Sequence, residues 1–206
     1  MDNKVFQNLS YGLFVLSVNV EKRDNACIIN TGIQVSSSPD RICIAVNKAD
    51  FTCEMLDYTD RFCLSTISED ADFALFEHFG FKSGRDVEKF DGFDCAERTS
   101  NGTLAVTKGT NSYICATVEQ KIDLGSHFLY IAAVTDGKIL SGTPSATYAY
   151  YHANIKPKPQ KSQNASGKTV WRCAVCGYEY EGEELPADFV CPLCKHGASD
   201  FEKVTK

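Results

Sequence analysis

Cys173-Ala-Val-Cys176-Gly-Tyr and the later Cys191-Pro-Leu-Cys194-Lys, with 14 residues between Cys176 and Cys191, decide how the C-terminal part of this chain folds. In each Cys-x-x-Cys turn two sulfur atoms point at one centre, and backbone N–H groups inside the turn point at those sulfurs. Two such turns form one tetrahedral site of four thiolates, which suits Zn(II) or a single iron atom. The sequence therefore predicts a metal centre with the ligands Cys173, Cys176, Cys191 and Cys194. The spacing alone does not choose the metal.

Aromatic residues surround the two turns. A module this small needs rings for its apolar core and a metal as its staple. The five rings are Trp171, Tyr178, Tyr180, Phe189 and Phe201. With these rings and the acidic spacer, residues 170–204 resemble a short-spacer rubredoxin. The resemblance implies one iron bound by the four cysteines, where the rings exclude water and N–H···S bonds tune the potential. The alternative is a zinc ribbon that binds a partner.

The composition is that of a globular protein. The chain has 206 residues, of which 43% are hydrophobic and 23% charged, enough for one good core and a small appendage. The net charge of −6 disfavours a nucleic-acid partner. We expect no membrane association, because no apolar run approaches the length of a membrane span and the N-terminus lacks the features of a signal peptide. These features predict a cytoplasmic protein.

The remaining cysteines have a different character. Six of the ten lie outside the two turns, scattered singly and mostly among apolar neighbours. They are Cys27, Cys43, Cys53, Cys63, Cys95 and Cys115. Such positions are typical of reduced thiols in a core rather than of a disulfide scaffold.

Residues 152–168 mark a domain boundary. This stretch has four lysines, no acidic residue and almost nothing to bury. It is predicted to be a flexible basic linker with a reach of roughly 20–25 Å. The chain is therefore expected to divide into a domain over residues 1–151, the linker, and the metal domain over residues 169–206.

Residues 1–151 are predicted to be mainly β. Apolar and polar residues alternate over residues 14–20 and 42–46, and two long β-rich runs cover residues 112–124 and 127–134. Many strands with few helices favour a β-barrel.

Two short helices are predicted to interrupt these strands. They are expected to start at Asp50 and Asp70, because each of these capping residues is followed by apolar residues spaced by three and four. The domain contains neither Gly-x-Gly-x-x-Gly nor a phosphate loop ending in Gly-Lys-Ser/Thr. A nicotinamide would therefore bind in another way than in a Rossmann fold.

Several segments of residues 1–151 resemble the flavin reductase-like family. They are residues 25–31 with 34–39, 47–52, 79–90, 125–127 and 147–151. The resemblance implies a split β-barrel that binds FMN at the interface of a homodimer. It also implies a phosphate-side loop at residues 79–90 and a closing aromatic strand at residues 147–151. The chain departs from the family at Ile28 and Asn30, where many members have Thr and Ser.

The residue types in these segments suit FMN, which offers a dianionic phosphate, a polar chain and a flat ring. Ser83, Arg85 and Lys89 lie in a Gly-containing loop expected to enter a short helix, where hydroxyl, charged and N–H groups can converge on an anion. The predicted flavin contacts are Asn30, Thr31, Ser36, Asn47, Lys48, Thr52, Ser83, Arg85 and Lys89.

Each group of predicted contacts has an alternative interpretation. The basic residues of the loop can be a charged surface segment. Asn47 and Thr52 can cap the helix at Asp50. Asn30 and Thr31 can be ordinary polar residues of a strand.

His127 is the candidate catalytic residue. Its position resembles that of a family histidine near the flavin that helps to place the nicotinamide, and an imidazole there can donate a hydrogen bond. The alternative is a surface histidine in a turn, because hydride transfer needs close stacking and orientation more than an acid or a base.

The two halves together predict an enzyme, an NAD(P)H:flavin/rubredoxin-type oxidoreductase. A flavin accepts a two-electron hydride and releases electrons singly, whereas a mononuclear iron site carries one electron. The expected path runs from NAD(P)H through FMN to the Fe(Cys)4 centre and on to an acceptor. The whole architecture resembles the high-molecular-weight rubredoxins of anaerobes, which implies an acceptor protein of the flavo-diiron NO or O2 reductase type.

Three other functions remain open at this point. The chain can be a flavin or ferric reductase with an accessory rubredoxin, an electron-transfer module that never binds a nicotinamide, or a zinc-ribbon binding protein with a cofactor-free barrel. Neither a ribose-binding acid nor an arginine for a 2′-phosphate can be assigned, so the sequence does not distinguish NADH from NADPH.

Overall fold

The computed structural model describes residues 5, 8–157, 169–174, 178–191 and 197–205. The chain forms two compact units, Met1–Lys156 and Pro157–Lys206.

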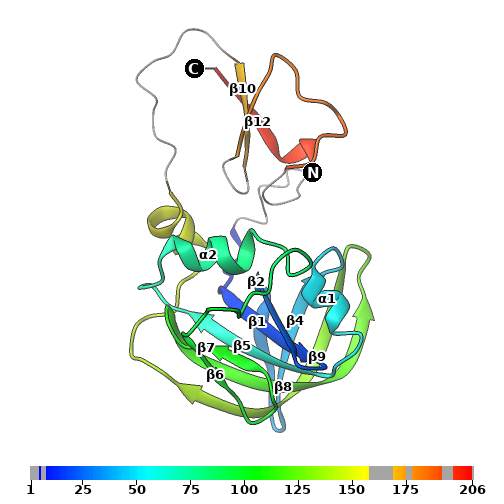
Figure 1. The fold of residues 1–206 in the computed structure, drawn as a ribbon, viewed down its shortest axis with the longest axis vertical. Helices are drawn as coiled ribbons and strands as arrows, with labels where there is room; N and C mark the ends of the chain where they lie inside the picture. The colour runs from blue at the N-terminus through cyan, green and yellow to red at the C-terminus, as the bar shows by residue number, and fades with distance from the viewer. Residues whose placement is uncertain (1–4, 6–7, 158–168, 175–177, 192–196, 206) are drawn as a thin grey trace. The chain divides into compact units, whose positions relative to one another are not determined.

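The first unit is built on an antiparallel sheet that has seven strands within the described residues (Figure 1). The order of the strands is β2-β1-β5-β8-β9-β4-β3. They are β1 Phe14–Val20, β2 Arg23–Ile29, β3 Gly32–Ser37, β4 Asp40–Asn47, β5 Arg61–Ile67, β8 Thr110–Asp123 and β9 His127–Ile139. A separate ribbon pairs β6 (Ala96–Arg98) with β7 (Leu104–Val106).

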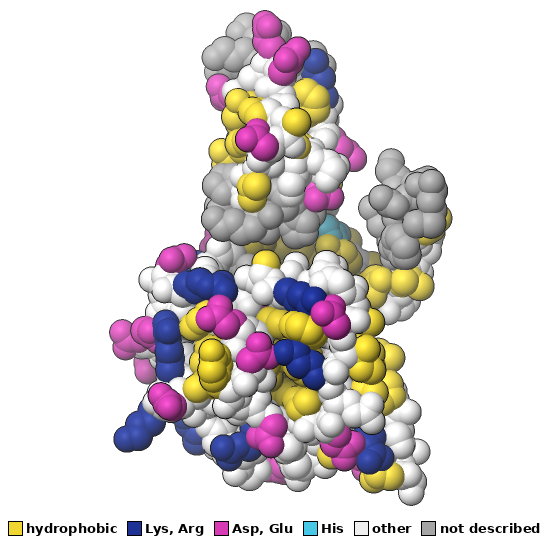
Figure 2. All heavy atoms as spheres, turned by 90° about the vertical axis from the view of Figure 1, so that its right-hand side faces the viewer, with side chains coloured by type: hydrophobic (Ala, Val, Ile, Leu, Met, Phe, Trp, Pro, Cys, Tyr) yellow, Lys and Arg dark blue, Asp and Glu magenta, His cyan; other side chains and the backbone are white. Residues whose placement is uncertain are grey.

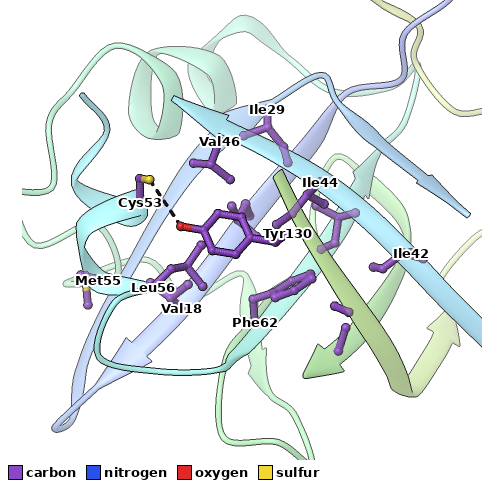
Figure 3. Close-up of a cluster of buried hydrophobic side chains, with 14 residues drawn as sticks. Val18, Ile29, Ile42, Ile44, Val46, Cys53, Met55, Leu56, Phe62 and Tyr130 are labelled. Carbon is purple, nitrogen blue, oxygen red and sulfur yellow. Dashed lines mark hydrogen bonds between the residues drawn. The ribbon is translucent and has the colours of Figure 1, made fainter. Parts of the chain in front are cut away.

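Strands far apart in this sheet share one core. Leu16 and Val18 of β1 lie in the same buried cluster as Ile44 of β4, although β5, β8 and β9 separate the two strands in the sheet. A flat sheet keeps such strands apart, so the sheet curls into a barrel. The Tyr130 ring lies among these side chains, and its hydroxyl contacts the Cys53 sulfur at 3.6 Å (Figure 3). The prediction of a mainly β barrel is confirmed.

Two short helices pack against the barrel. Helix α1 (Phe51–Met55) follows β4 and contacts β1 and β2, and α2 (Phe73–Gly80) contacts β2. Asp50 is the N-cap residue of α1, as predicted. No helix among the described residues combines the length and the apolar character needed to cross a bilayer.

Helix α2 begins later than predicted. The Asp72 carboxylate accepts the N–H of Leu75 at 3.2 Å, so Asp72 is the cap and the helix starts at Phe73. The prediction of a start at Asp70 is wrong, because the Asp70 carboxylate instead accepts a hydrogen bond from the Ser68 hydroxyl before the helix.

The aromatic segment expected as a closing strand is helical instead. The Thr147 hydroxyl accepts the N–H of Tyr150 at 3.0 Å and caps α3 (Tyr148–Tyr150), which continues as the π-helix η2 (Tyr151–Ile155). Ile155 packs on the core beneath α2. The first unit therefore continues past residue 151, where the sequence-based boundary lies.

The second unit is a small three-stranded sheet within its described residues. The strand order is β11-β10-β12, with β10 Thr169–Cys173, β11 Glu179–Glu181 and β12 Phe201–Thr205. A short 3-10 helix, η3 (Ala198–Asp200), precedes β12. All pairings are antiparallel. Cys173 and Cys191, the first cysteines of the two Cys-x-x-Cys motifs, lie in one small core.

Candidate flavin site and metal centre

Backbone contacts bring together the two ends of each cysteine-containing turn. The N–H of Cys173 donates to the Tyr178 carbonyl at 2.8 Å and closes the first turn. A β-bridge between Val190 and Gly197 closes the second. Cys173 is thus held at the end of β10, and Cys191 lies next to the isolated bridge between Val190 and Gly197.

The thiols of Cys173 and Cys191 lie in one apolar cluster, with 1% and 0% of the residue exposed. Their neighbours in that cluster are Trp171, Tyr178, Tyr180, Leu185, Phe189 and Phe201. Two buried thiols shielded by rings fit a soft metal ion, whose thiolate ligands need protection from water. The other predicted ligands, Cys176 and Cys194, lie outside the described residues.

In the first unit, Asn47 and His127 meet where β4 ends and β9 begins. They face each other as paired residues of the β4–β9 ladder. The half-buried His127 ring contacts the Ser126 hydroxyl through Nδ1 at 2.8 Å. The Asn47 side-chain oxygen accepts the N–H of Ala49 at 2.9 Å and so orders the approach to α1. Two residues that are 80 positions apart are therefore neighbours at one strand end.

Lys48 adds a cation beside this pair. Its ammonium binds the Asp123 carboxylate at 2.6 Å and lies 4.4 Å from the centre of the Phe128 ring. The Lys121 ammonium lies 3.8 Å from the same ring. The surface drawn in Figure 2 has the same mixed character, with basic, acidic and hydrophobic side chains next to one another.

Thr52 is buried and bonded inside the unit rather than exposed to a ligand. Its hydroxyl accepts the Asn25 side-chain N–H at 2.8 Å, and 1% of Thr52 is exposed. The Asn25 side-chain oxygen is also buried and has no hydrogen-bond partner among the described residues. A Cβ at Gly84 would lie 2.0 Å from that oxygen, so only glycine fits there. An unpaired buried acceptor of this kind is costly.

Lys89 is also buried, with 1% of the residue exposed. Its ammonium donates to the Phe79 carbonyl at 3.0 Å. Burial lowers the pKa of this ammonium from 10.5 to about 8, while Cys27 and Asp50 act in the opposite direction. The expectation of a surface cation does not hold for Lys89, because the loop turns its side chain into the domain.

The loop that carries Ser83 and Arg85 contains turns but no helix. The N–H groups of Asp86 and Val87 both donate hydrogen bonds to the Ser83 carbonyl, at 3.0 and 3.1 Å. The described residues of the loop after this turn form no helix. The expected short helix is therefore wrong. The Ser83 hydroxyl is engaged within the loop, where it accepts the N–H of Arg85 at 3.1 Å.

Two guanidinium groups flank the Phe51 ring at the start of α1. Arg23 and Arg85 lie 4.8 and 5.2 Å from the ring centre. Each also pairs with a carboxylate, Arg23 with Glu88 at 2.9 Å and Arg85 with Glu54 at 2.5 Å. All four charged side chains are between 41% and 57% exposed. Because solvent-exposed pairs of this kind are weak, an incoming phosphate can replace their carboxylates.

The three predicted contacts around β3 do not form one group. The Thr31 hydroxyl donates to the Ala45 carbonyl at 2.6 Å, so it ties β3 to β4, and Asn30 is half-buried beside it in the chain. Ser36 pairs with Arg41, at the far end of the β3–β4 hairpin from Asn47. Arg41 lies six residues before Asn47 on β4. At about 3.3 Å per residue, Ser36 is therefore roughly 20 Å from Asn47. Within one chain Ser36 therefore does not join the other predicted contacts.

Arg23 and Asn25 are the residues of this region that sequence reasoning missed as contacts. Arg23 binds the Gly84 carbonyl at 2.9 Å, and Asn25 binds Thr52. A signal was present, because Asn25 is a polar residue directly before the apolar half of β2. Its partner on the loop could not be found from that pattern.

Residues 6–158 match the family described as "Flavin reductase like domain". The chain belongs to this family. Residues 171–202 match a second family, "Rubrerythrin, rubredoxin-like domain". The predicted fusion of a flavin reductase-like domain with a rubredoxin-like domain is confirmed, and so is the prediction that the chain is a flavin oxidoreductase.

Curated relatives have the same organisation or part of it. The chain is 30% identical to the high molecular weight rubredoxin of Moorella thermoacetica, over 99% of this chain and 100% of that protein. It is 29% identical to a ferric-chelate reductase (NAD(P)H) of Archaeoglobus fulgidus, over 79% of this chain and 95% of that protein.

Solved structures share the fold of the first unit. An FMN-binding protein of Thermus thermophilus superposes with a TM-score of 0.60 at 22% identity, covering 66% of this chain and 75% of its own. The NADH:FAD oxidoreductase of Streptomyces globisporus C-1027 superposes with a TM-score of 0.64 at 18% identity, covering 78% and 92%. The predicted split β-barrel is confirmed.

Proposed function

We propose that this protein takes electrons from NAD(P)H into FMN, passes them singly to an Fe(Cys)4 centre in its C-terminal domain, and delivers them to an acceptor protein. One observation carries the proposal: a flavin reductase-like domain and a rubredoxin-like domain occur in one chain. A bound flavin supplies a carrier that takes up two electrons and releases them one at a time. The similarity to a high molecular weight rubredoxin over the whole chain supports the order of transfer.

The flavin site is proposed to lie between the end of β4 and the loop over residues 81–90. Arg85 and Arg23 are the proposed phosphate-binding cations, because both are half-exposed and reach the same loop. A terminal dianionic phosphate suits two guanidinium groups, which supports FMN over FAD. Asn47 and His127 are the proposed neighbours of the ring and of the nicotinamide, and the His127 imidazole would orient the nicotinamide by hydrogen bonding.

The iron centre is proposed to use all four cysteines of the two turns. The buried thiols of Cys173 and Cys191 and the surrounding rings support this assignment. The chain's own contribution is to keep water from the sulfurs of Cys173 and Cys191, because backbone contacts hold the chain at both cysteines and the rings surround them.

A homodimer is proposed to complete the flavin site. An apolar groove of about 290 Å³ on the first unit is lined mainly by Phe14, Gly32, Ile42, Leu64, Ile114 and Val134. Beside it, the edge strand β3 exposes 63% of Ile33 and 49% of Val35. A second copy covering this face would bury the exposed apolar edge. Sedimentation of the flavin-loaded protein at micromolar concentration checks the proposal, and a monomer would contradict it.

An anaerobic titration tests the electron path. NADH or NADPH is added stepwise while the flavin and ferric tetrathiolate bands are followed together. We expect the iron band to bleach at the expense of the nucleotide, with two iron centres reduced for each nucleotide oxidised. Reduction of flavin without bleaching of iron would contradict the relay. The absence of any reduction by either nucleotide would favour the electron-transfer module that another protein reduces.

A second candidate function is a reductase of ferric chelates or free flavin with an accessory C-terminal domain. The similarity to the Archaeoglobus ferric-chelate reductase favours it. The Cys173→Ser variant separates the two functions. Under the relay, the variant loses transfer to a protein acceptor. Under the alternative, reduction of a ferric chelate continues at the parental rate and remains the main activity.

The terminal acceptor is proposed to be a flavo-diiron NO or O2 reductase in the cytoplasm, as the resemblance of the sequence implies. Reconstitution of NAD(P)H-driven O2 or NO consumption with such an enzyme checks this step. The control omits only the chain studied here. Equal rates with and without it would contradict the assignment.

A further inference from the structure

Two cysteines face each other on neighbouring strands of the barrel, in a small cluster separate from the main core. Cys63 of β5 and Cys115 of β8 are directly paired across the antiparallel ladder. Both residues are 0% exposed, and they belong to one small buried cluster with Ala105 and Tyr113. Neither is a predicted metal ligand or flavin contact, so nothing in the proposed electron path uses them.

An antiparallel ladder has two kinds of directly opposite residue pair, which differ in the distance between their Cα atoms. Cys63 and Cys115 form the kind with the shorter distance. The N–H of Val118 donates to the Asp60 carbonyl at 2.7 Å, which makes Asp60 and Val118 a hydrogen-bonded pair. Hydrogen-bonded and non-hydrogen-bonded pairs alternate along an antiparallel ladder. The register is unbroken from there to Cys63 and Cys115, three residues along, so theirs is a non-hydrogen-bonded pair. Such pairs have Cα atoms about 4.5 Å apart, within the roughly 4.4–6.8 Å that a disulfide spans.

The surroundings give the two thiols different roles. Hydrogen bonds from Cys63 and Thr99 lower the pKa of the Cys115 thiol, against the opposing effect of burial. The hydrogen bond with Cys115 and burial raise the pKa of Cys63. The hydrogen bond from Thr99 favours a thiolate at Cys115, so Cys115 is the better placed of the two to attack first.

We propose that Cys63 and Cys115 are a dithiol site that hydrogen peroxide converts to a reversible cross-strand disulfide. The Cys115 thiolate attacks one peroxide oxygen, the O–O bond breaks, and Cys115 becomes a sulfenic acid while water leaves. The Cys63 sulfur then attacks the Cys115 sulfur, the S–O bond breaks, and the second water leaves. In total, two thiols and one peroxide give one disulfide and two waters. Burial excludes larger thiols, so Cys63 is the thiol in position to resolve the sulfenic acid.

Peptide mass analysis of the full-length chain tests the proposal. The reduced protein is exposed to hydrogen peroxide, quenched with catalase, blocked with an alkylating agent under denaturing conditions and cut with trypsin. Cys63 and Cys115 fall in separate tryptic peptides, residues 62–82 and 109–121, each with a single cysteine. We expect these two peptides to be linked, lighter than their sum by two hydrogen atoms, and to separate on treatment with dithiothreitol.

Cys43 is the internal control. It lies in the tryptic peptide of residues 42–48 and faces Ile33 and Ile131 across its ladders, so no thiol stands opposite. The comparison is made at the time when all of Cys43 is oxidised. At that time, we expect most of the Cys115 that has reacted to be in the disulfide-linked peptides. Unreacted Cys115 at that point, sulfinic acid in place of the link, or equal linkage to other cysteines would each overturn the proposal.

The Cys63→Ala variant separates the two steps. Its Cys115 has no resolving partner, so we expect a persistent sulfenic acid that a 1,3-dione probe labels, with little labelling in the parent chain. Retention of the flavin band shows that the variant is folded. If Cys63→Ala does not fold, the product analysis of the parent chain decides alone. Equal labelling of Cys115 in the folded variant and in the parent would refute the role of Cys63.

Discussion

The buried ammonium of Lys89 makes the stability of the first unit depend on pH. Its pKa is lowered by burial from 10.5 to about 8. Below pH 8 the lysine is protonated in both the folded and the unfolded chain, and the full cost of the buried charge is present. Between pH 8 and 10.5 the unfolded chain binds more protons than the folded one, so stability rises with pH. Above 10.5 the cost is gone.

The size of this rise follows from the shift. Each pKa unit corresponds to about 1.4 kcal/mol, so the window from pH 8 to 10.5 is worth about 3 kcal/mol. The Lys89→Met variant keeps most of the apolar stem and has no titrating group. It also loses the donor to the Phe79 carbonyl, which costs the same at every pH. The difference in unfolding free energy between parent and variant should therefore grow by about 3 kcal/mol across the window.

Urea unfolding at several pH values measures this difference. The single tryptophan, Trp171, lies in the second unit, so its fluorescence follows that unit alone. Circular dichroism then reports the unfolding of the β-rich first unit. Lys108→Met is the matched control, because Lys108 is an exposed lysine of the first unit that does not contribute to the pKa shift of Lys89, and it should leave the pH dependence unchanged.

One result would decide against this reasoning, and another would change the role assigned to Lys89. A parent–variant difference that stays flat from pH 8 to 10.5 would mean that Lys89 carries no depressed pKa. If the rise is present without flavin but vanishes when FMN is bound, the phosphate lies against the ammonium. Lys89 would then return to the group of phosphate ligands that the sequence predicted.

Three further predictions address other parts of the chain. Cys173→Ser should lose iron and onward transfer while NAD(P)H-driven flavin reduction continues, because one soft ligand is removed; Cys43→Ser is the control, and parental transfer to the acceptor would contradict the relay. Gly84→Ala should destabilise the first unit by about 1–3 kcal/mol in urea, since its Cβ would collide with Asn25, whereas Gly142→Ala, with nothing within 4 Å, should change little. Cutting the chain near residue 163 should make reduction of iron by flavin concentration-dependent in stopped-flow spectra; an unchanged rate would mean that the linker does not hold the relay together.

Local sequence patterns predicted the features that depend only on residues close together in the chain. The two Cys-x-x-Cys turns are short enough that their spacing alone predicts a four-thiolate centre. Alternation of apolar and polar residues predicted β1 and β4, because side chains of a strand alternate between its two faces. The same local reasoning misplaced the start of α2 and missed the helix after Thr147, where one capping side chain decides between conformations.

The sequence by itself predicted a metal-binding head, a linker and a β-rich domain, because each of these predictions rests on composition or on spacing over a few residues. Only the tertiary structure decided that Lys89 points inward, that Asn25 meets Gly84, and that Cys63 faces Cys115. These three contacts join residues that are at least 10 positions apart in the chain. Their partners depend on the order and register of strands in a closed sheet, which the cooperative burial of one core selects.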